Sequence, residues 1–185
     1  MQDARLTSWL WGPVSALGIW AALLTLAADQ AHKWWILAVY RLQDRGRVHV
    51  TPFLDLVYLK NRGISYGLLP LYSREGQWLF AGFAGLAVVV MAVWLARGIT
   101  GKLPALSLGL IMGGAAGNAI DRLVLGGVAD YMQLHAFGFY WYVFNIADAA
   151  LVAGCCGLLY EFLRSESQSR RKVALSPSTK RGLGG

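Results

Sequence analysis

Four long stretches with almost no charge constrain this chain more than any other feature of its sequence. They cover residues 11–28, 78–96, 103–120 and about 139–163. A helix rises about 1.5 Å per residue, so about 20 apolar residues cross the roughly 30 Å hydrocarbon core of a bilayer. The fourth stretch has one charge well inside it, Asp148, and Glu161 near its end. The pattern predicts an all-α integral membrane protein with four transmembrane helices.

The composition agrees with a membrane protein and argues against two other classes. Of the 185 residues, 56% are hydrophobic and 15% are charged, whereas a soluble domain has about 25% charged residues. The formal net charge of +7 could indicate nucleic-acid binding, but such a protein spreads Lys and Arg over a polar face. We therefore expect membrane lipid as a partner, and no nucleic acid.

The first stretch could also be a cleavable signal peptide, because Arg5 precedes it and Ala27 and Ala28 follow its apolar core. Three more stretches follow, however, and this one is long for the apolar region of a signal peptide. Asp29 and Lys33, which come directly after it, also make better sense as retained functional groups. We therefore expect a retained span.

Lys and Arg between the spans predict the orientation. The link 97–102 has two cations and no acid, and the tail 164–185 has six cations against Glu166, so both are expected in the cytosol. With four spans, residues 1–10 are then also cytosolic, and segments 29–77 and 121–138 lie on the outer face, although these outer segments carry cations too. The basic tail is expected to be disordered or to lie on anionic lipid.

The outer segment of residues 41–77 has a pattern of its own. β-Branched and apolar residues between Val48 and Leu59 are interrupted by Pro52, as in short strands. The turn-forming residues Asn61 and Gly63 follow. We expect a small, partly β extracytoplasmic cap on the membrane domain of residues 11–163.

Asp148 is the clearest candidate for a functional group. An ionisable side chain inside a span costs about 2.5–3.5 kcal/mol on insertion scales, so it is a functional hypothesis by default. Asn145 lies three residues earlier, on the same helical face. The alternative is a polar pair that joins helices, but Asn145 alone would do this without the cost of a charge.

Two further groups of polar residues lie at the outer ends of the spans. Asp29 and Lys33 have the i, i+4 spacing of an ion pair on one helix, with a structural or substrate-positioning role. Asp121 ends the third span beside Arg122, about one turn after Asn118. This spacing predicts a polar cluster at the interface in which the charge of Asp121 is compensated.

Asp130 lies in a Gly-rich segment without a basic neighbour close in sequence, so it is free to pair with another acid. An ordinary loop aspartate is the alternative, and the residues around it leave the question open. The three histidines, His32, His49 and His135, are scattered and lack the spacing of metal ligands. We expect no metal site.

Five segments carry a resemblance to a known family. They are residues 29–33 (Asp-Gln-Ala-His-Lys), 61–67 (Asn-Arg-Gly-Ile-Ser-Tyr-Gly), 117–122 (Gly-Asn-Ala-Ile-Asp-Arg), 127–131 (Gly-Val-Ala-Asp-Tyr) and 144–148 (Phe-Asn-Ile-Ala-Asp). In sequence, order and spacing they resemble the motifs of lipoprotein signal peptidase, also called signal peptidase II, the membrane aspartyl protease of bacteria. The resemblance covers roughly residues 10–163 and leaves out the basic tail.

The resemblance implies a catalytic pair, Asp130 and Asp148, and so favours function for Asp130. It implies that eight residues shape the site or hold substrate: Asp29, Lys33, Asn61, Gly63, Asn118, Asp121, Arg122 and Asn145. The implied substrate is a prolipoprotein cleaved on the amino side of a cysteine that carries diacylglyceryl. Two close carboxylates cannot both ionise cheaply, so we expect them to share a proton and activate water without metal or cofactor.

Two departures from the family pattern concern substrate contacts rather than chemistry. They are Ile64-Ser65-Tyr66 and the residues beside the catalytic aspartate, Ala129 and Tyr131. We expect a monomer in the bacterial inner membrane, with both termini in the cytosol and the active site toward the outer face.

Two readings from other classes remain as alternatives. In a small proton-coupled transporter or channel subunit, Asp148, Asp29 and Lys33 would relay protons or pair with an ion. Four spans without an internal repeat argue against this reading. In a non-catalytic membrane scaffold, Asp130 and Asp148 would both be dispensable.

Overall fold

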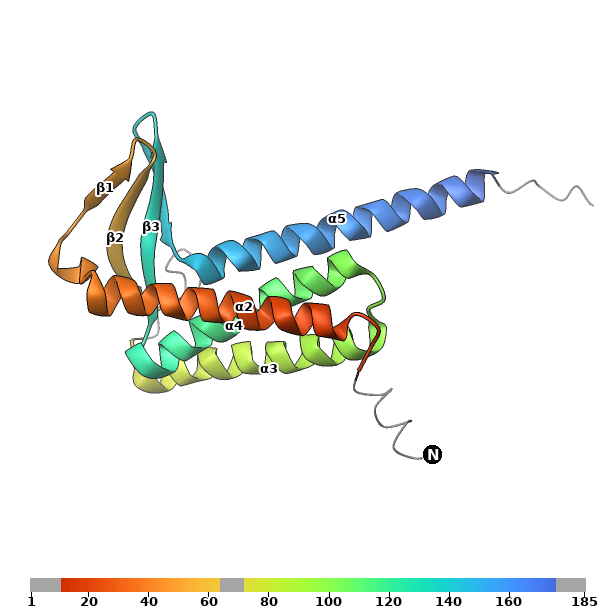
Figure 1. Ribbon diagram of the computed structural model, residues 1–185, viewed down its shortest axis with the longest axis horizontal. Helices are drawn as coiled ribbons and strands as arrows, with labels where there is room; N and C mark the ends of the chain where they lie inside the picture. The colour runs from red at the N-terminus through yellow and green to blue at the C-terminus, as the bar shows by residue number, and fades with distance from the viewer. Residues whose placement is uncertain (1–10, 64–71, 176–185) are drawn as a thin grey trace, which may run out of the picture.

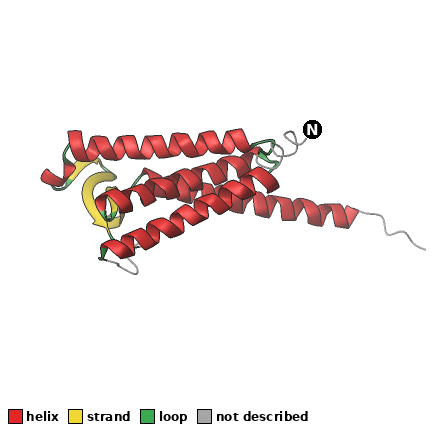
Figure 2. Cartoon of the chain, turned by 90° about the horizontal axis from the view of Figure 1, so that it is seen from below, coloured by secondary structure: helices red, strands yellow, loops and turns green. Residues whose placement is uncertain are grey.

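The computed structural model describes residues 11–63 and 72–175 (Figure 1). In this part of the chain, four long helices run side by side and a four-stranded sheet stands at one end of them, as the view from below also shows (Figure 2). The helices are α2 (Ser15–Trp34), α3 (Arg74–Gly98), α4 (Lys102–Leu125) and α5 (Ile146–Leu175). The far end of α5 extends beyond the other three (Figure 1).

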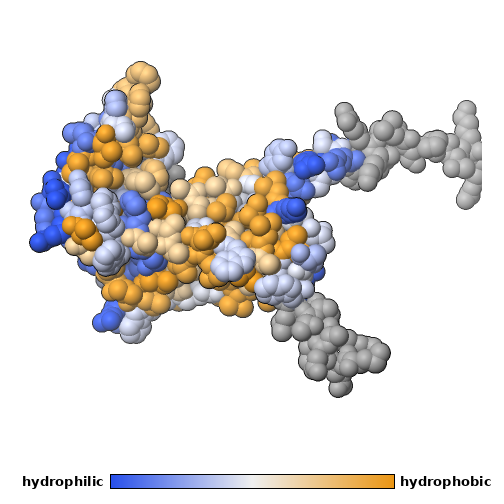
Figure 3. All heavy atoms as spheres, in the orientation of Figure 1, coloured by the Kyte–Doolittle hydropathy of each residue, from blue (hydrophilic) through white to orange (hydrophobic). Residues whose placement is uncertain are grey.

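Three of the described helices are long and apolar enough to cross a membrane: α3, α4 and the part of α5 from Ile146 to Gln168. The fourth, α2, is 20 residues long, but its last turns hold buried Asp29 and Lys33. Large apolar side chains such as Phe83 and Leu86 are exposed on α3, and apolar residues gather over the helices on the face seen in Figure 3. An apolar outer surface of this extent is typical of a protein that faces lipid.

Helix α4 lies at the centre of the bundle and packs against α2, α3 and α5. Small residues allow this close packing. A Cβ atom added at Gly113 would lie 2.5 Å from the Ala22 carbonyl oxygen of α2, and one added at Gly114 would lie 2.5 Å from the Ala147 carbonyl oxygen of α5. The bundle therefore brings the polar ends of α2, α4 and α5 close together.

The sheet is antiparallel, in the order β1 (Val48–Thr51), β2 (Leu54–Asn61), β3 (Val128–Ala136) and β4 (Phe139–Phe144). Its register pairs Asn61 with Val128 and Leu59 with Asp130. The end of β2 and the start of β3 therefore lie together at the base of the sheet, where it meets the helices (Figure 1).

The structure corrects two boundaries of the predicted fold. The sheet extends beyond the β-structured cap expected at about residues 41–77, because β3 and β4 supply half of its strands. The chain is therefore not all-α. The fourth helix begins at Ile146 rather than near Phe139. Residues 139–144 are all aromatic or β-branched, and such residues favour a strand.

The carboxy-terminal tail also differs from the prediction. Helix α5 continues to Leu175, so the first part of the basic tail 164–185 is helical rather than disordered. An ion pair of 2.6 Å between Glu166 and Arg170, one helical turn apart, supports this extension. Residues 1–10, 64–71 and 176–185 lie outside the described part. The departure from the family pattern at Ile64-Ser65-Tyr66 falls in the second of these ranges.

Candidate active site

Asn145 joins the two predicted catalytic aspartates. Its Nδ2 donates to Asp130 Oδ1 on β3 at 2.7 Å, and its Oδ1 accepts from the backbone nitrogen of Asp148 at 2.9 Å. In return, Asp148 Oδ2 accepts from the backbone nitrogen of Asn145 at 3.2 Å. This reciprocal pair of bonds caps the start of α5. The turn between β4 and α5 thus holds one carboxylate and orients the amide that binds the other.

Asn118 of α4 fixes Asp148 from the opposite side. Its Nδ2 donates to Asp148 Oδ1 at 2.8 Å. Its Oδ1 accepts from Asn145 Nδ2 at 3.2 Å and from Lys33 Nζ at 3.2 Å. Both carboxylates therefore accept hydrogen bonds from side-chain amides, which add no charge of their own.

Lys33 is a buried cation between two buried carboxylates. Its Nζ lies 2.8 Å from Asp29 Oδ2 and 2.9 Å from Asp121 Oδ2, and the three side chains are at most 3% exposed. The predicted i, i+4 pair of Asp29 and Lys33 is confirmed. Asp121 is also charge-compensated as predicted, but by Lys33 of α2. A buried charge needs such pairing because leaving it unpaired would be strongly unfavourable.

This buried charge cluster also holds the backbone beside each aspartate of the candidate pair. Asp29 Oδ1 accepts from the nitrogen of Ala147, which precedes Asp148, at 3.0 Å. Asp121 Oδ2 accepts from the nitrogen of Ala129, which precedes Asp130, at 3.0 Å. The acids of the cluster therefore position the two candidate catalytic residues through the chain itself.

Asn61 completes the surroundings of Asp130. Its Nδ2 donates to Asp130 Oδ2 at 3.1 Å, and its Oδ1 accepts from the nitrogen of Gly63 at 3.0 Å. Arg122 donates to the carbonyl oxygens of Gly63 and Asn118, both at 3.1 Å. All ten predicted site residues thus belong to one connected network at the junction of the sheet with α2, α4 and α5.

The surroundings of Asp130 favour its protonated form. Its side chain is 2% exposed, and burial together with the charge of Asp148 raises its pKa to about 7, against the opposing effects of Asn61, Asn145 and Lys33. Burial and nearby acids also raise the pKa of Tyr58 and Tyr131. A carboxyl group with a pKa near neutrality can donate or accept a proton at physiological pH.

Sequence reasoning missed some contributors to the network. Gln30 Nε2 lies 3.1 Å from both Asp29 Oδ2 and Asp121 Oδ1, so it bridges the two acids; its place in the 29–33 motif was the available signal. His32 Nδ1 lies 2.9 Å from the hydroxyl of Tyr131, and the two rings stack. No spacing in the sequence indicates that contact.

Comparisons with known proteins show which family this chain resembles. A family model described as "Signal peptidase (SPase) II" matches residues 21–164. A protein named lipoprotein signal peptidase from Methylocella silvestris is 50% identical over 149 residues, which are 80% of this chain and 86% of the relative. One of the same name from Methylobacterium sp. (strain 4-46) is 48% identical over 161 residues, 87% of this chain and 96% of the relative.

A solved structure described as "Bacterial membrane enzyme structure by the in meso method at 2.3 A resolution" has a similar fold. It aligns with a TM-score of 0.72 at 25% sequence identity, over 82% of this chain and 90% of that chain.

Proposed function

Because the chain belongs to the lipoprotein signal peptidase (signal peptidase II) family of aspartic peptidases, we propose that Asp130 and Asp148 are the catalytic pair of its peptidase activity. The observation that carries this assignment is the role of Asn145, which binds Asp130 through its side chain and Asp148 through its capping bonds. The acids Asp29 and Asp121 are engaged with Lys33 instead. That pairing makes them poor candidates for accepting a proton from water.

In the proposed mechanism the pair holds one proton. The ionised aspartate takes a proton from water, and the water oxygen attacks the carbonyl carbon of the scissile peptide bond. The protonated aspartate donates its proton to the carbonyl oxygen, which gives a neutral tetrahedral intermediate. When the carbon–nitrogen bond breaks, the leaving amine takes a proton from the pair, and a hydroxyl group of the intermediate returns a proton to it. The new carboxyl group forms on the signal peptide, and the pair again holds one proton. A pKa near 7 for Asp130 supports this cycle at neutral pH.

The substrate we propose is a prolipoprotein cleaved on the amino side of a cysteine that carries diacylglyceryl. The relatives' name, lipoprotein signal peptidase, supports this substrate class. The position of the network supports it as well, because the candidate pair lies where the sheet meets the ends of the apolar helices. There, a lipidated cysteine could remain in the bilayer while water reaches the peptide bond from the side of the sheet.

The protein is a multi-pass bacterial membrane protein, and we propose that its sheet and active site face outward. The cations of the link 97–102 and of the segment after Leu163 support cytosolic termini. All ten residues of the network come from one chain, which supports a monomer as the active form.

The test is a gel-shift assay with purified protein in detergent and a diacylglyceryl-modified prolipoprotein. We expect the wild type to release the signal peptide, and Asp130→Asn and Asp148→Asn to keep the fold and bind substrate without cleaving it. Asp44→Asn is the matched control, because its side chain is 53% exposed and pairs with Arg41. Cleavage by both active-site variants would refute the assignment and make Asp29 and Asp121 the next acids to test. A wild type that is inert on a competent substrate would instead favour the transporter or scaffold alternatives.

A further inference from the structure

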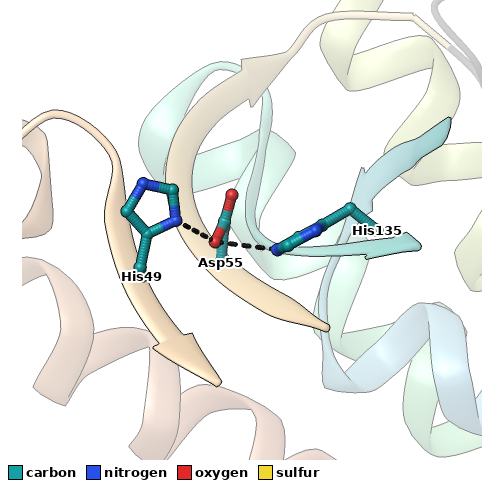
Figure 4. A group of neighbouring side chains, drawn as sticks. All are labelled: His49, Asp55 and His135. Atoms are coloured by element: carbon teal, nitrogen blue, oxygen red, sulfur yellow. Dashed lines mark hydrogen bonds and ion pairs between the residues drawn. The ribbon is translucent and has the colours of Figure 1, made fainter. Parts of the chain in front are cut away.

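A second cluster of ionisable side chains lies on the sheet, apart from the network around Asp130. His49 of β1, Asp55 of β2 and His135 of β3 point toward one another (Figure 4). His49 faces Asp55 directly across the strand pair, and Asp55 is paired with Gln133, two residues before His135. Side chains two residues apart on a strand share a face. The strand register thus brings together two histidines that are 86 positions apart in the sequence, as their numbers show.

Both imidazole rings converge on the same oxygen atom. His49 Nδ1 lies 2.7 Å from Asp55 Oδ1, and His135 Nε2 lies 3.1 Å from it. The three candidate ligand atoms all lie within 4.8 Å of one another. The other carboxylate oxygen, Oδ2, accepts a hydrogen bond of 2.6 Å from Arg47. Oδ1 is therefore the oxygen available to a shared ligand.

Neighbouring side chains hold the carboxylate and one of the rings in place. Arg47 also donates to Gln133 Oε1 at 2.8 Å, and the ring of His135 stacks on Tyr140 with centroids 5.2 Å apart. The side chain of Asp55 has no solvent exposure. The carboxylate of Asp55 is thus held in a fixed position, as a metal ligand requires.

The donor set and its dimensions fit a transition metal better than Mg²⁺ or Ca²⁺. Two imidazole nitrogens with one carboxylate oxygen suit Zn²⁺, whereas Mg²⁺ and Ca²⁺ prefer oxygen ligands. Bonds of about 2.0–2.1 Å in a tetrahedral site put ligand atoms about 3.3 Å apart. The observed 2.7 and 3.1 Å are close to that spacing, and His49, with a side chain 71% exposed, has room to adjust.

We propose that His49, Asp55 and His135 form a site for one divalent transition-metal ion such as Zn²⁺, with water in the fourth position. The ion would connect three neighbouring strands. It would fasten the edge strand β1, whose residues are mostly exposed, to the centre of the sheet. The site is independent of the peptidase mechanism and uses none of its residues.

Zn²⁺ binding to the full-length protein without a polyhistidine tag tests the proposal. Purified protein in detergent at pH 7.5 competes with a chromophoric chelator for Zn²⁺, and we expect one ion per chain. His49→Ala and His135→Ala should each lower the affinity at least tenfold, since even changes to residues that only support a ligand cost about 10–100-fold. The remaining histidine, His32, bonds to Tyr131 instead, so His32→Ala is the matched control and should bind as tightly as wild type.

Two further measures keep the result interpretable. Every protein in this test carries the substitutions Cys155→Ser and Cys156→Ser, because both cysteines are exposed thiols that could bind Zn²⁺ themselves. The protein with these two substitutions alone is called the background protein. Hydrogen exchange should show that Zn²⁺ protects the amides of β1 in the His32→Ala protein and not in His49→Ala. Because His49 is mostly exposed, its replacement should leave the melting temperature without metal close to that of the background protein.

Two results would overturn the proposal. The first is the absence of saturable Zn²⁺ binding by the background protein, which would leave the cluster as a set of hydrogen bonds around Asp55. The second is equal binding by the background protein and a folded His49→Ala variant. Mg²⁺ in place of Zn²⁺ should give neither binding nor protection of β1, and protection by Mg²⁺ would likewise contradict the ligand set.

Discussion

Replacing Asp130 by Asn should change stability in a way that depends on pH. The pKa of Asp130 rises from 3.8 to about 7 on burial beside Asp148. The folded state therefore binds more protons than the unfolded state between about pH 4 and pH 7, so stability falls as pH rises through this window. One pH unit corresponds to about 1.4 kcal/mol. The ionised Asp130 thus costs about 4 kcal/mol above pH 7, and nothing below about pH 4.

The Asn side chain removes this penalty and introduces a smaller one. Asn61 and Asn145 both donate to the carboxylate of Asp130, and an amide offers only one oxygen. One donor then loses its acceptor, which costs about 1–3 kcal/mol at every pH. The variant should therefore be less stable than wild type near pH 4 and more stable by about 1–3 kcal/mol at pH 8.

Thermal unfolding in detergent, followed by circular dichroism at pH 4.5 and pH 8, measures the effect. The stability difference between variant and wild type should change by about 3 kcal/mol between these pH values, which corresponds to about 6–12 °C in the midpoint. One scan rate is used throughout because unfolding can be irreversible. Asp44→Asn controls for the loss of an exposed carboxylate. A midpoint difference that is the same at both pH values would refute the proton-sharing pair.

Two other substitutions test the buried charge cluster. Lys33→Met should destabilise the protein by about 3–5 kcal/mol, because Asp29 and Asp121 lose their only cation contact shown in the described residues; an unchanged melting temperature would argue against the cluster's importance. Gly117→Ala places a Cβ atom 2.5 Å from Asp29 Oδ2 and should cost about 1–3 kcal/mol, whereas Gly82→Ala meets nothing within 4 Å and should leave the melting temperature nearly unchanged. Equal effects of the two glycine variants would show that the Asp29 contact does not matter.

Local geometry explains why much of the site could be predicted from sequence. Asp29 and Lys33 pair because a helix places residues four apart side by side, and the distance of 2.8 Å between Lys33 Nζ and Asp29 Oδ2 follows that rule. The cation opposite Asp121 could not be found in this way. The neighbouring Arg122 was the nearest one in sequence, but Lys33 reaches Asp121 from α2 only because the helices pack closely.

The strands were harder to predict, for a different reason. Residues 139–144 are apolar and lead almost directly into the apolar start of α5, so hydropathy alone joins a strand and a helix into one span. The break lies at Asn145, and the usable signal was its spacing from Asp148, which is that of a reciprocal helix cap. The approach of His49 to His135 depends on the register of three strands, which no spacing in the sequence reveals.

The hydrogen bond from Asn61 to Asp130 allows a test of the proposed mechanism that is separate from stability. This bond, 3.1 Å long, stabilises the ionised carboxylate and so lowers the pKa of Asp130. If cleavage requires the proton of Asp130, activity should fall as pH rises through about 7. Asn61→Ala removes the bond, so Asp130 should keep its proton to higher pH.

Peptidase activity of Asn61→Ala should therefore decline at a higher pH than that of wild type, in addition to any loss of rate at its optimum. The matched control is Leu59→Ala, because Leu59 lies opposite Asp130 in the strand register and its side chain is 47% exposed; its alkaline decline should coincide with that of wild type. A decline of Asn61→Ala at a lower pH would mean that the group lost on the alkaline side is not Asp130. The proton donor would then have to be sought at Asp148, which Asn61 does not contact through any bond described in the structure.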